Sequence, residues 1–191
     1  SRDREFVLLA LWAVWLRRSI AVTVNPAFPE NRIRQLMKHC GSNVLLADPE
    51  SFNQLPEEIH ILYPQSLYTE SHPDQELSWP EIHPNDPALV IFTSGSTGHP
   101  KAAVLSLGNL CFNALGAISR TQLGPGDQWL LSLPLHHIGG LGIVFRCLFS
   151  GAAMVLGKPY TTLEDQLKED RITHVSLVPT QLQRLLESEV G

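Results

Sequence analysis

The sequence predicts an α/β fold in which a mostly parallel sheet is flanked by helices. Helical and strand-like patterns alternate over residues 5–47, and the same alternation resumes over residues 88–182. Such alternation is typical of parallel sheets, because each helix carries the chain back to the edge where the next strand begins. Hydrophobic residues make up 43% of the 191-residue chain, which is enough to build a sizeable core under these helices.

The chain begins with two predicted helix–strand pairs. Pro29 and Glu30 favour a helix start, since proline suits the first turn and a carboxylate complements the positive helix N-terminus. That helix is expected to end at Gly41, because glycine readily adopts the left-handed conformation of a C-cap. The predicted helices cover 5–18 and 29–40, and the predicted strands cover 20–24 and 43–47.

Residues 48–87 are predicted to form an irregular, proline-rich connection with one short strand at 59–63. Seven prolines interrupt this stretch, and each one lacks the backbone N–H that helices and sheets need. After it, strands are expected at 88–92, 102–106, 129–133, 152–156 and 174–178. Helices are expected at 107–119, at 139–149, at 163–169 and from Pro179 onward, with a tight turn at 124–127.

Composition argues against several classes of partner. The formal net charge of −5 gives no sign of a nucleic-acid partner. The apolar run 6–16 is too short for a bilayer, which needs about 20 residues, so no membrane span is expected. Three sparse cysteines indicate reduced thiols and a cytoplasmic location. The sequence contains no zinc-type cluster of cysteine and histidine, so no metal site is expected. The sequence leaves open whether the chain forms a homo-oligomer.

The stretch after the predicted strand 88–92 is the most informative one. Its glycines let the backbone approach a ligand, its successive N–H groups and hydroxyls can hold an anion, and its lysine adds a positive charge. We interpret it as a loop that wraps a polyphosphate, the alternative being a polar hairpin turn. The residues are Thr93, Ser94, Gly95, Ser96, Thr97, Gly98, His99, Pro100 and Lys101.

The whole string from Phe92 to Lys101 is similar to the signature phosphate loop of the adenylate-forming superfamily, which includes acyl-CoA synthetases, luciferases and peptide-synthetase adenylation domains. The resemblance implies that the fold is part of the large N-terminal domain of such an enzyme. It also implies that Gly95 and Gly98 let the loop close. The residues implied to bind the phosphates of ATP are Thr93, Ser94, Ser96, Thr97 and Lys101, the last of them as a catalytic group.

Two adjacent histidines follow the predicted strand 129–133. A histidine is more often a structural residue than a functional one, and we interpret His136 in that way. Pro134, His137 and Gly140, however, match a P-x-x-H-x-x-G pattern of the same superfamily. That resemblance implies that His137 is a catalytic residue that lines the site between the acid and the phosphates.

Arg146 and Ser176 are polar residues within apolar stretches. A charge such as Arg146 is costly to bury unless it is paired, and the alternative is a side chain that reaches the surface. For Ser176, in the predicted strand 174–178, the alternative is a core serine bonded to the backbone. The segments 129–135 and 176–182 resemble the o-succinylbenzoate–CoA ligases of menaquinone biosynthesis, whose aromatic diacid substrate carries a second carboxylate. The resemblance implies that Arg146, with Ser176 beside it, holds that carboxylate.

The resemblance also implies a reaction in two halves. The acid attacks the α-phosphate of ATP to give an acyl-adenylate, and the thiol of CoA then displaces AMP. Mg²⁺ is expected to accompany ATP, although no acidic ligand for it is identifiable, and the expected partners are small molecules. Residues 1–191 lack the superfamily's later motifs and its C-terminal domain. We therefore expect a partial AMP-binding domain that is inactive alone. The alternatives are part of another acid–CoA ligase or peptide-synthetase domain, and a non-catalytic nucleotide-binding module.

Overall fold

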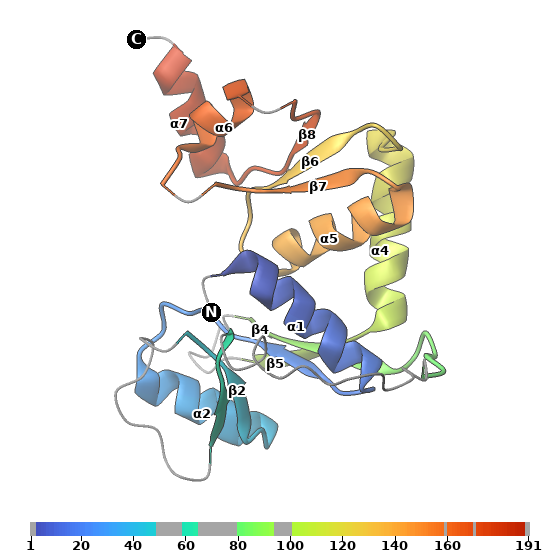
Figure 1. The fold of residues 1–191 in the computed structure, drawn as a ribbon, viewed down its shortest axis with the longest axis vertical. Helices are drawn as coiled ribbons and strands as arrows, with labels where there is room; N and C mark the ends of the chain where they lie inside the picture. The colour runs from blue at the N-terminus through green and yellow to red at the C-terminus, as the bar shows by residue number, and fades with distance from the viewer. Residues whose placement is uncertain are drawn as a thin grey trace. The chain divides into compact units, whose positions relative to one another are not determined.

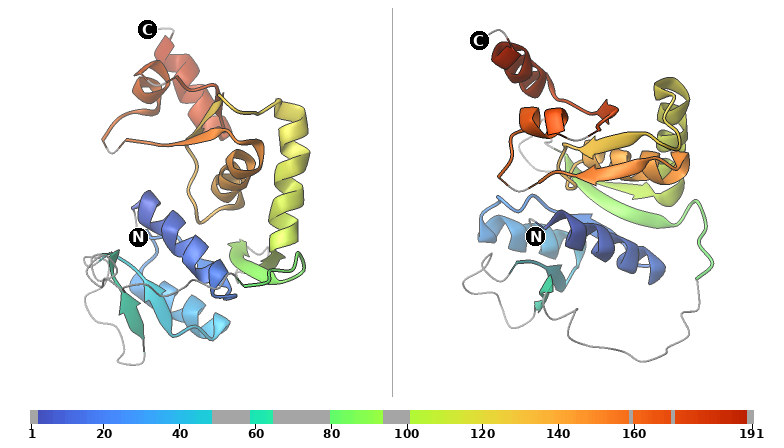
Figure 2. Two further views of the ribbon diagram at one scale, coloured as in Figure 1. Left: turned by 45° about the vertical axis from the view of Figure 1, so that its right-hand side comes forward. Right: turned by 45° about the horizontal axis from the view of Figure 1, so that its top comes forward.

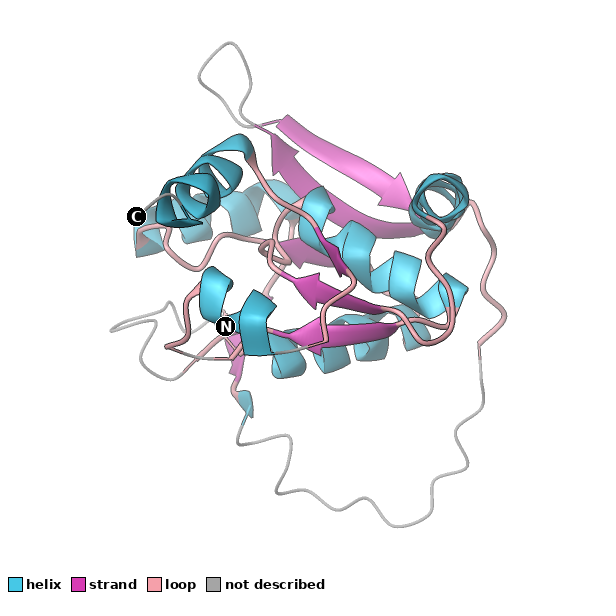
Figure 3. Cartoon of the chain, turned by 90° about the horizontal axis from the view of Figure 1, so that it is seen from above, coloured by secondary structure: helices cyan, strands magenta, loops and turns pink. Residues whose placement is uncertain are grey.

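The computed structural model describes residues 3–48, 59–64, 80–93, 101–158, 160–169 and 171–189. The chain divides into two compact units, Ser1–Leu105 and Ser106–Gly191, and each is described by itself. In both units helices lie beside strands (Figure 1; Figure 3), and the strand pairs with a defined register are parallel. These features confirm the predicted α/β fold class. The strands of the described residues form three smaller sheets instead of the single sheet that the sequence predicts.

In the first unit a sheet forms around strand β4, Pro87–Thr93, whose middle residues are fully buried. Strand β1, Ala21–Thr23, runs parallel to β4, and β5, Lys101–Ser106, lies on the other side of β4. Helix α1, Arg4–Leu16, packs against this sheet through Trp15, whose indole N–H donates to the carbonyl of Ala88 at 2.8 Å. The predicted helix and strands are therefore present and joined by a buried hydrogen bond.

The first unit also contains a second helix and a two-stranded sheet. Helix α2, Glu30–Cys40, ends where Gly41 takes a φ of +64°, as its sequence predicts. Strand β2, Val44–Leu46, pairs in parallel with β3, His60–Leu62, which is the short strand expected within the proline-rich connection. Residues 49–58 and 65–79 of that connection lie outside the described residues.

The second unit is a three-layered α/β arrangement. Helices α4 and α5 lie on one side of a parallel sheet with strand order β7-β6-β8, and α6 and α7 lie on the other side (Figure 1; Figure 2). The strands are β6, Gln128–Leu131, β7, Ala153–Leu156, and β8, His174–Val175. The helices are α4, Leu107–Thr121, α5, Ile138–Ser150, α6, Leu163–Glu169, and α7, Pro179–Glu189.

The core of the second unit lies between the sheet and α5. Leu130 and Leu131 of β6 and Leu141 and Ile143 of α5 are almost completely buried. Each such side chain contributes about 1.5–3 kcal/mol of burial free energy. The packing between β6 and α5 fixes α5, and with it Arg146, which is predicted to bind the acid. At the other end of the unit, Ser106 caps α4 by accepting a hydrogen bond from the Asn109 N–H.

Strand β8 is shorter than predicted. The apolar pattern indicated a strand over 174–178, but β8 ends at Val175. The pairing of β8 with β6 ends at Leu130 and Val175, although β6 itself continues to Leu131, so the residues after Val175 are not paired in this sheet. Ser176 therefore lies just beyond a strand, and its carbonyl accepts a hydrogen bond from the Ser132 hydroxyl at 2.5 Å.

Candidate active site

The phosphate-binding prediction falls in the first unit. Thr93 ends β4 and Lys101 begins β5, and both are exposed. The Thr93 hydroxyl donates to the carbonyl of Lys101 at 3.4 Å, so the two ends of the predicted loop lie together. A mobile ammonium and a hydroxyl at the exposed end of a buried strand are suited to phosphate oxygens. Ser94, Gly95, Ser96, Thr97 and Gly98 lie outside the described residues, so their roles stay predictions.

The predicted histidine motif forms the turn that leads into α5. The N–H of His137 donates to the carbonyl of Pro134 at 3.2 Å, and His137 is the N-cap residue of the helix. A Cβ atom added to Gly140 would lie only 2.3 Å from the carbonyl oxygen of Pro134. Glycine is therefore required at this position by the close approach of the backbone. This contact explains the spacing of proline, histidine and glycine in the motif.

The two histidines differ in their surroundings. Their ring centroids are 4.3 Å apart, but His136 is half-buried and His137 is exposed. Burial, and then the nearby charge of His137, lowers the pKa of His136. His136 is thus favoured in its neutral form. His137 is the member of the pair that is accessible to a ligand at the start of α5.

Arg146 projects from α5 toward the sheet. Its guanidinium carbon lies 5.3 Å from the ring centroid of Trp129 on β6, within the range of a cation–π contact. Burial lowers the pKa of the guanidinium, although arginine stays charged at neutral pH. Its Nε atom is buried and has no hydrogen-bond partner among the described residues. The side chain is therefore partly buried, and the predicted alternative of a surface arginine does not describe it.

Two residues in contact with Arg146 were not predicted from the sequence. Trp129 is 4% exposed, and its indole N–H also lacks an acceptor among the described residues. A Cβ atom added to Gly142 would lie 3.2 Å from Nη2 of Arg146. Gly142 is four residues before Arg146, and this spacing, which places two residues on one helix face, is the signal that could have indicated the contact.

Arg146 and Ser176 are not directly bonded to each other. Within the described part of the chain, no hydrogen bond or ion pair joins them. Arg146 contacts Trp129, the second residue of β6, whereas Ser176 is bonded to Ser132, just beyond the end of the same strand. Both residues thus contact β6 or the residue that follows it, but at different points along the strand. The sequence expectation that Ser176 stands within a strand is corrected by the early end of β8.

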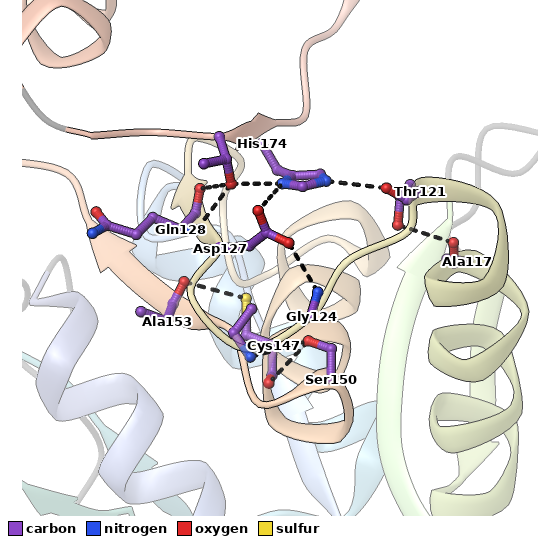
Figure 4. Close-up of polar contacts among 11 residues, drawn as sticks. Ala117, Thr121, Gly124, Asp127, Gln128, Cys147, Ser150, Ala153 and His174 are labelled. Atoms are coloured by element: carbon purple, nitrogen blue, oxygen red, sulfur yellow. Dashed lines mark hydrogen bonds and ion pairs between the residues drawn. The ribbon is translucent and has the colours of Figure 1, made fainter.

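A polar network fixes the beginnings of β6 and β8 (Figure 4). The Nε2 atom of His174 lies 3.2 Å from the Thr121 carbonyl, and its Nδ1 atom lies 2.8 Å from the Thr173 hydroxyl. The His174 ring is also 5.3 Å from that of Trp129. The network therefore holds the end of α4 and the neighbourhood of Trp129 together.

No group of three or more histidine, cysteine or acidic side chains in the described ranges lies close enough to hold a metal ion. None of the helices that the structure describes combines the length and the apolar character needed to cross a membrane.

Comparison with known proteins decides the family. The family model described as AMP-binding enzyme matches residues 2–190, which is almost the whole chain.

The chain belongs to the AMP-binding enzyme family.

The relatives of the chain include acid–CoA ligases. A 2-succinylbenzoate–CoA ligase of Haemophilus influenzae is 35% identical over 189 residues, which cover 98% of this chain and 36% of the relative. An indoleacetate–CoA ligase of Aromatoleum aromaticum is 32% identical over 180 residues, covering 84% of this chain and 34% of the relative. The chain thus spans little more than a third of the length of these curated relatives.

Solved structures show the same fold. The o-succinylbenzoate CoA synthetase (MenE) of Bacillus subtilis in complex with the acyl-adenylate intermediate OSB-AMP has a TM-score of 0.85 and 28% identity over 97% of this chain and 49% of that one. The same enzyme in complex with ATP and magnesium ion has a TM-score of 0.82 and 26% identity over 96% of this chain and 50% of that one. These likenesses confirm the predicted superfamily fold.

Proposed function

We propose that this AMP-binding enzyme acts in the ATP-dependent activation of o-succinylbenzoate and its transfer to CoA. The proposal rests on the environment of the Arg146 side chain. Its guanidinium is partly buried on Trp129, and its Nε–H has no acceptor within the described ranges. A buried donor without a partner is costly, and a carboxylate is the acceptor that best matches an arginine fork. A diacid supplies such a carboxylate in addition to the one that reacts.

The reaction consists of two displacements. A carboxylate oxygen of the acid attacks the α-phosphorus of ATP, and pyrophosphate leaves with the electrons of the broken P–O bond. The sulfur of CoA then attacks the acyl carbon, and AMP leaves. The protein contributes mainly by positioning the reactants and stabilising charge. We assign Lys101 and Thr93 to the departing phosphates, together with the loop residues Ser94, Ser96 and Thr97, and we assign His137 to the space between acid and phosphate.

The donors of the described residues fit a phosphate better than a metal ion. Lys101 and Thr93 offer a positive charge and a hydroxyl, which suit phosphate oxygens. In the parts of the chain that the structure describes, no group of three or more histidine, cysteine or acidic side chains is placed to hold a metal ion. Mg²⁺ would neutralise phosphate charge and would be held largely by the phosphates themselves, which is its usual mode in such sites.

Replacement of Arg146 tests the acid-binding part of the proposal. In full-length protein, we expect Arg146→Ala to lower the ratio of kcat/KM for o-succinylbenzoate over 3-benzoylpropionate, which lacks the ring carboxylate. Loss of one partner of a buried charge pair costs about 2 kcal/mol or more, which is roughly 30-fold in this ratio. Arg120→Ala, an exposed arginine on α4, is the matched control. An unchanged preference in Arg146→Ala would refute the assignment.

Replacement of Lys101 tests the phosphate-binding part. We expect Lys101→Ala to lower the rate of ATP–pyrophosphate exchange about 10²-fold, as removal of a group that stabilises transition-state charge does in other enzymes. Lys38→Ala, which removes an exposed lysine from α2, should leave the exchange rate unchanged. Full exchange activity in Lys101→Ala would contradict the phosphate-binding role of Lys101, whereas a wild-type protein that shows no exchange would support a non-catalytic nucleotide-binding module.

A second candidate is a ligase for a monocarboxylic acid. It is favoured by the 32% identity to an indoleacetate–CoA ligase. Thioester formation by full-length protein with o-succinylbenzoate, indoleacetate and 3-benzoylpropionate separates the two. Equal or better use of the monoacids would favour this candidate, whereas the state of Arg146 leads us to expect a preference for the diacid.

A further inference from the structure

The Arg146 guanidinium is confined on two sides. On β6, the Trp129 ring centroid lies 5.3 Å from the guanidinium carbon. On α5 itself, the three atoms nearest to a Cβ added at Gly142 all belong to Arg146, at 3.2 Å for Nη2, 3.5 Å for Cζ and 3.8 Å for Nε. The side chain therefore lies back along its own helix, over a residue that has no side chain.

Both confining residues belong to the buried part of the second unit. Trp129 is 4% exposed, and Gly142 lies within the buried face of α5. An arginine side chain free in solvent samples many rotamers, and fixing it costs conformational entropy. Here the indole ring and the adjacent helix backbone fix the Arg146 side chain when the protein folds, so its conformational entropy is already lost before a ligand binds. A guanidinium fixed in this way loses little further freedom when it binds a carboxylate.

We propose that Trp129 and Gly142 are positioning residues that set the place and orientation of the Arg146 guanidinium for carboxylate recognition. The indole supports the cation, and the missing side chain of Gly142 leaves the space that the guanidinium occupies. The inference rests on the proposed function, because it gives Arg146 the second carboxylate of the acid as its ligand. Neither residue is required to touch the substrate.

Gly142→Ala provides the most direct test. The three atoms nearest to the added methyl group would all belong to the Arg146 guanidinium, while alanine favours the helix over glycine. We expect the preference for o-succinylbenzoate over 3-benzoylpropionate to fall about three- to tenfold, since a small misplacement of a binding group weakens recognition. The thermal midpoint of unfolding should stay the same or rise. A purely structural role for Gly142 would instead predict that any loss of preference is accompanied by a lower thermal midpoint.

Gly116→Ala is the matched control. Gly116 lies in α4, and a Cβ atom added there meets nothing within 4 Å. The preference for the diacid should stay at the wild-type value in this variant. An unchanged preference in Gly142→Ala, or an equal loss in Gly116→Ala, would overturn the role of Gly142.

Trp129 is tested by a pair of substitutions. Trp129→Phe keeps a smaller aromatic face and loses an N–H that has no acceptor in the described part of the chain, so the preference should be largely retained. Trp129→Leu removes the face, and the preference should fall about tenfold through a higher KM for the diacid. In an Arg146→Ala background, Trp129→Leu should have no further effect on the preference, because the group it positions is gone.

The outcomes separate the two proposals. If Arg146→Ala itself leaves the preference unchanged, the proposed function of this site fails, and the positioning role fails with it. If Arg146→Ala abolishes the preference but Gly142→Ala and Trp129→Leu retain it, only the positioning role is wrong. An additional loss of preference when Trp129→Leu is combined with Arg146→Ala would also contradict the positioning role.

Discussion

Asp127 shows how one side chain can organise the ends of two strands. Its carboxylate accepts a hydrogen bond from the Gly124 N–H at 2.9 Å, which closes the turn before β6. Its other oxygen lies 3.9 Å from Nδ1 of His174 at the start of β8. The backbone bond from Gly124, then the Thr173 hydroxyl and the nearby His174, lower the pKa of this carboxyl group from its ordinary value of 3.8.

The lowered pKa of Asp127 predicts an acid-dependent loss of stability. Because the native pKa lies below the unfolded one, the unfolded state takes up the proton first as the pH falls. The contribution of Asp127 should therefore be complete above the unfolded value and should disappear as the pH falls through the native one. Urea unfolding from pH 7 to pH 3 should show that Asp127→Ala is less stable than wild type at neutral pH and that the difference shrinks below the ordinary value of 3.8.

Glu81→Ala is the control for this pH profile, since its side chain is 84% exposed. Its profile should run parallel to that of the wild type. A difference between wild type and Asp127→Ala that stays constant down to pH 3 would contradict the role of Asp127.

At the scale of elements, the C-terminal ends of helices are set by nearby residues such as glycine, whereas the start of a helix also depends on packing against other segments. Helix α2 ends at Gly41 with a φ of +64°, and α5 ends at Gly151 with a φ of +74°. Helix α4, by contrast, continues to Thr121, two residues past its predicted end, and Gln122 takes the left-handed conformation with a φ of +56°. The entry to α5 requires Gly140, because the carbonyl of Pro134 occupies the space of a side chain.

This contact predicts opposite effects for two glycine substitutions. Gly140→Ala would place a methyl group 2.3 Å from a backbone oxygen, so α5 must shift, and we expect a loss of about 3 kcal/mol in the free energy of unfolding. Gly116→Ala meets nothing within 4 Å and should gain up to about 1 kcal/mol from the higher helix propensity of alanine. Urea unfolding measures both, and equal values for the two variants would contradict the close approach at Gly140.

At the scale of the whole molecule, each unit depends on contacts between segments far apart in the chain. In the first unit, the indole N–H of Trp15 reaches the carbonyl of Ala88, 73 residues away. In the second unit, the Gln128 N–H donates to the Thr173 hydroxyl, 45 residues away. These bonds tie α1 to β4, and the start of β6 to the start of β8. The position of Arg146 therefore depends on how the complete second unit folds.

Matched tryptophan substitutions test the energetic value of the long-range bond. Trp15 and Trp129 are both 4% exposed, but only Trp15 donates its indole N–H to an acceptor among the described residues. Trp15→Phe leaves the Ala88 carbonyl without this donor and should cost about 1–3 kcal/mol more than Trp129→Phe. Denaturant unfolding of each variant provides the comparison. Equal losses would show that the bond from Trp15 contributes nothing beyond packing.

The sequence by itself determined the local structure and the family resemblance. The helix end at Gly41 and the turn after Gly124 are present as predicted, because each depends on residues close together in the chain. The short strand predicted at 59–63 is also present, as β3 paired with β2. The string ending at Lys101 predicted the superfamily, and the family match and structural likenesses confirmed it. Hydrophobic period and turn chemistry act over a few residues, so they can be read without a structure.

Only the tertiary structure decided which side chains surround Arg146. The indole of Trp129 and the empty position of Gly142 lie against its guanidinium, and the sequence indicated neither role. The apolar pattern also did not predict the early end of β8, which leaves Ser176 outside the strand. Cross-strand neighbours and strand ends depend on how a strand pairs with a partner far away in the chain, here on the pairing of β8 with β6, which ends at Val175 and Leu130. A pattern of nearby residues carries no information about that pairing.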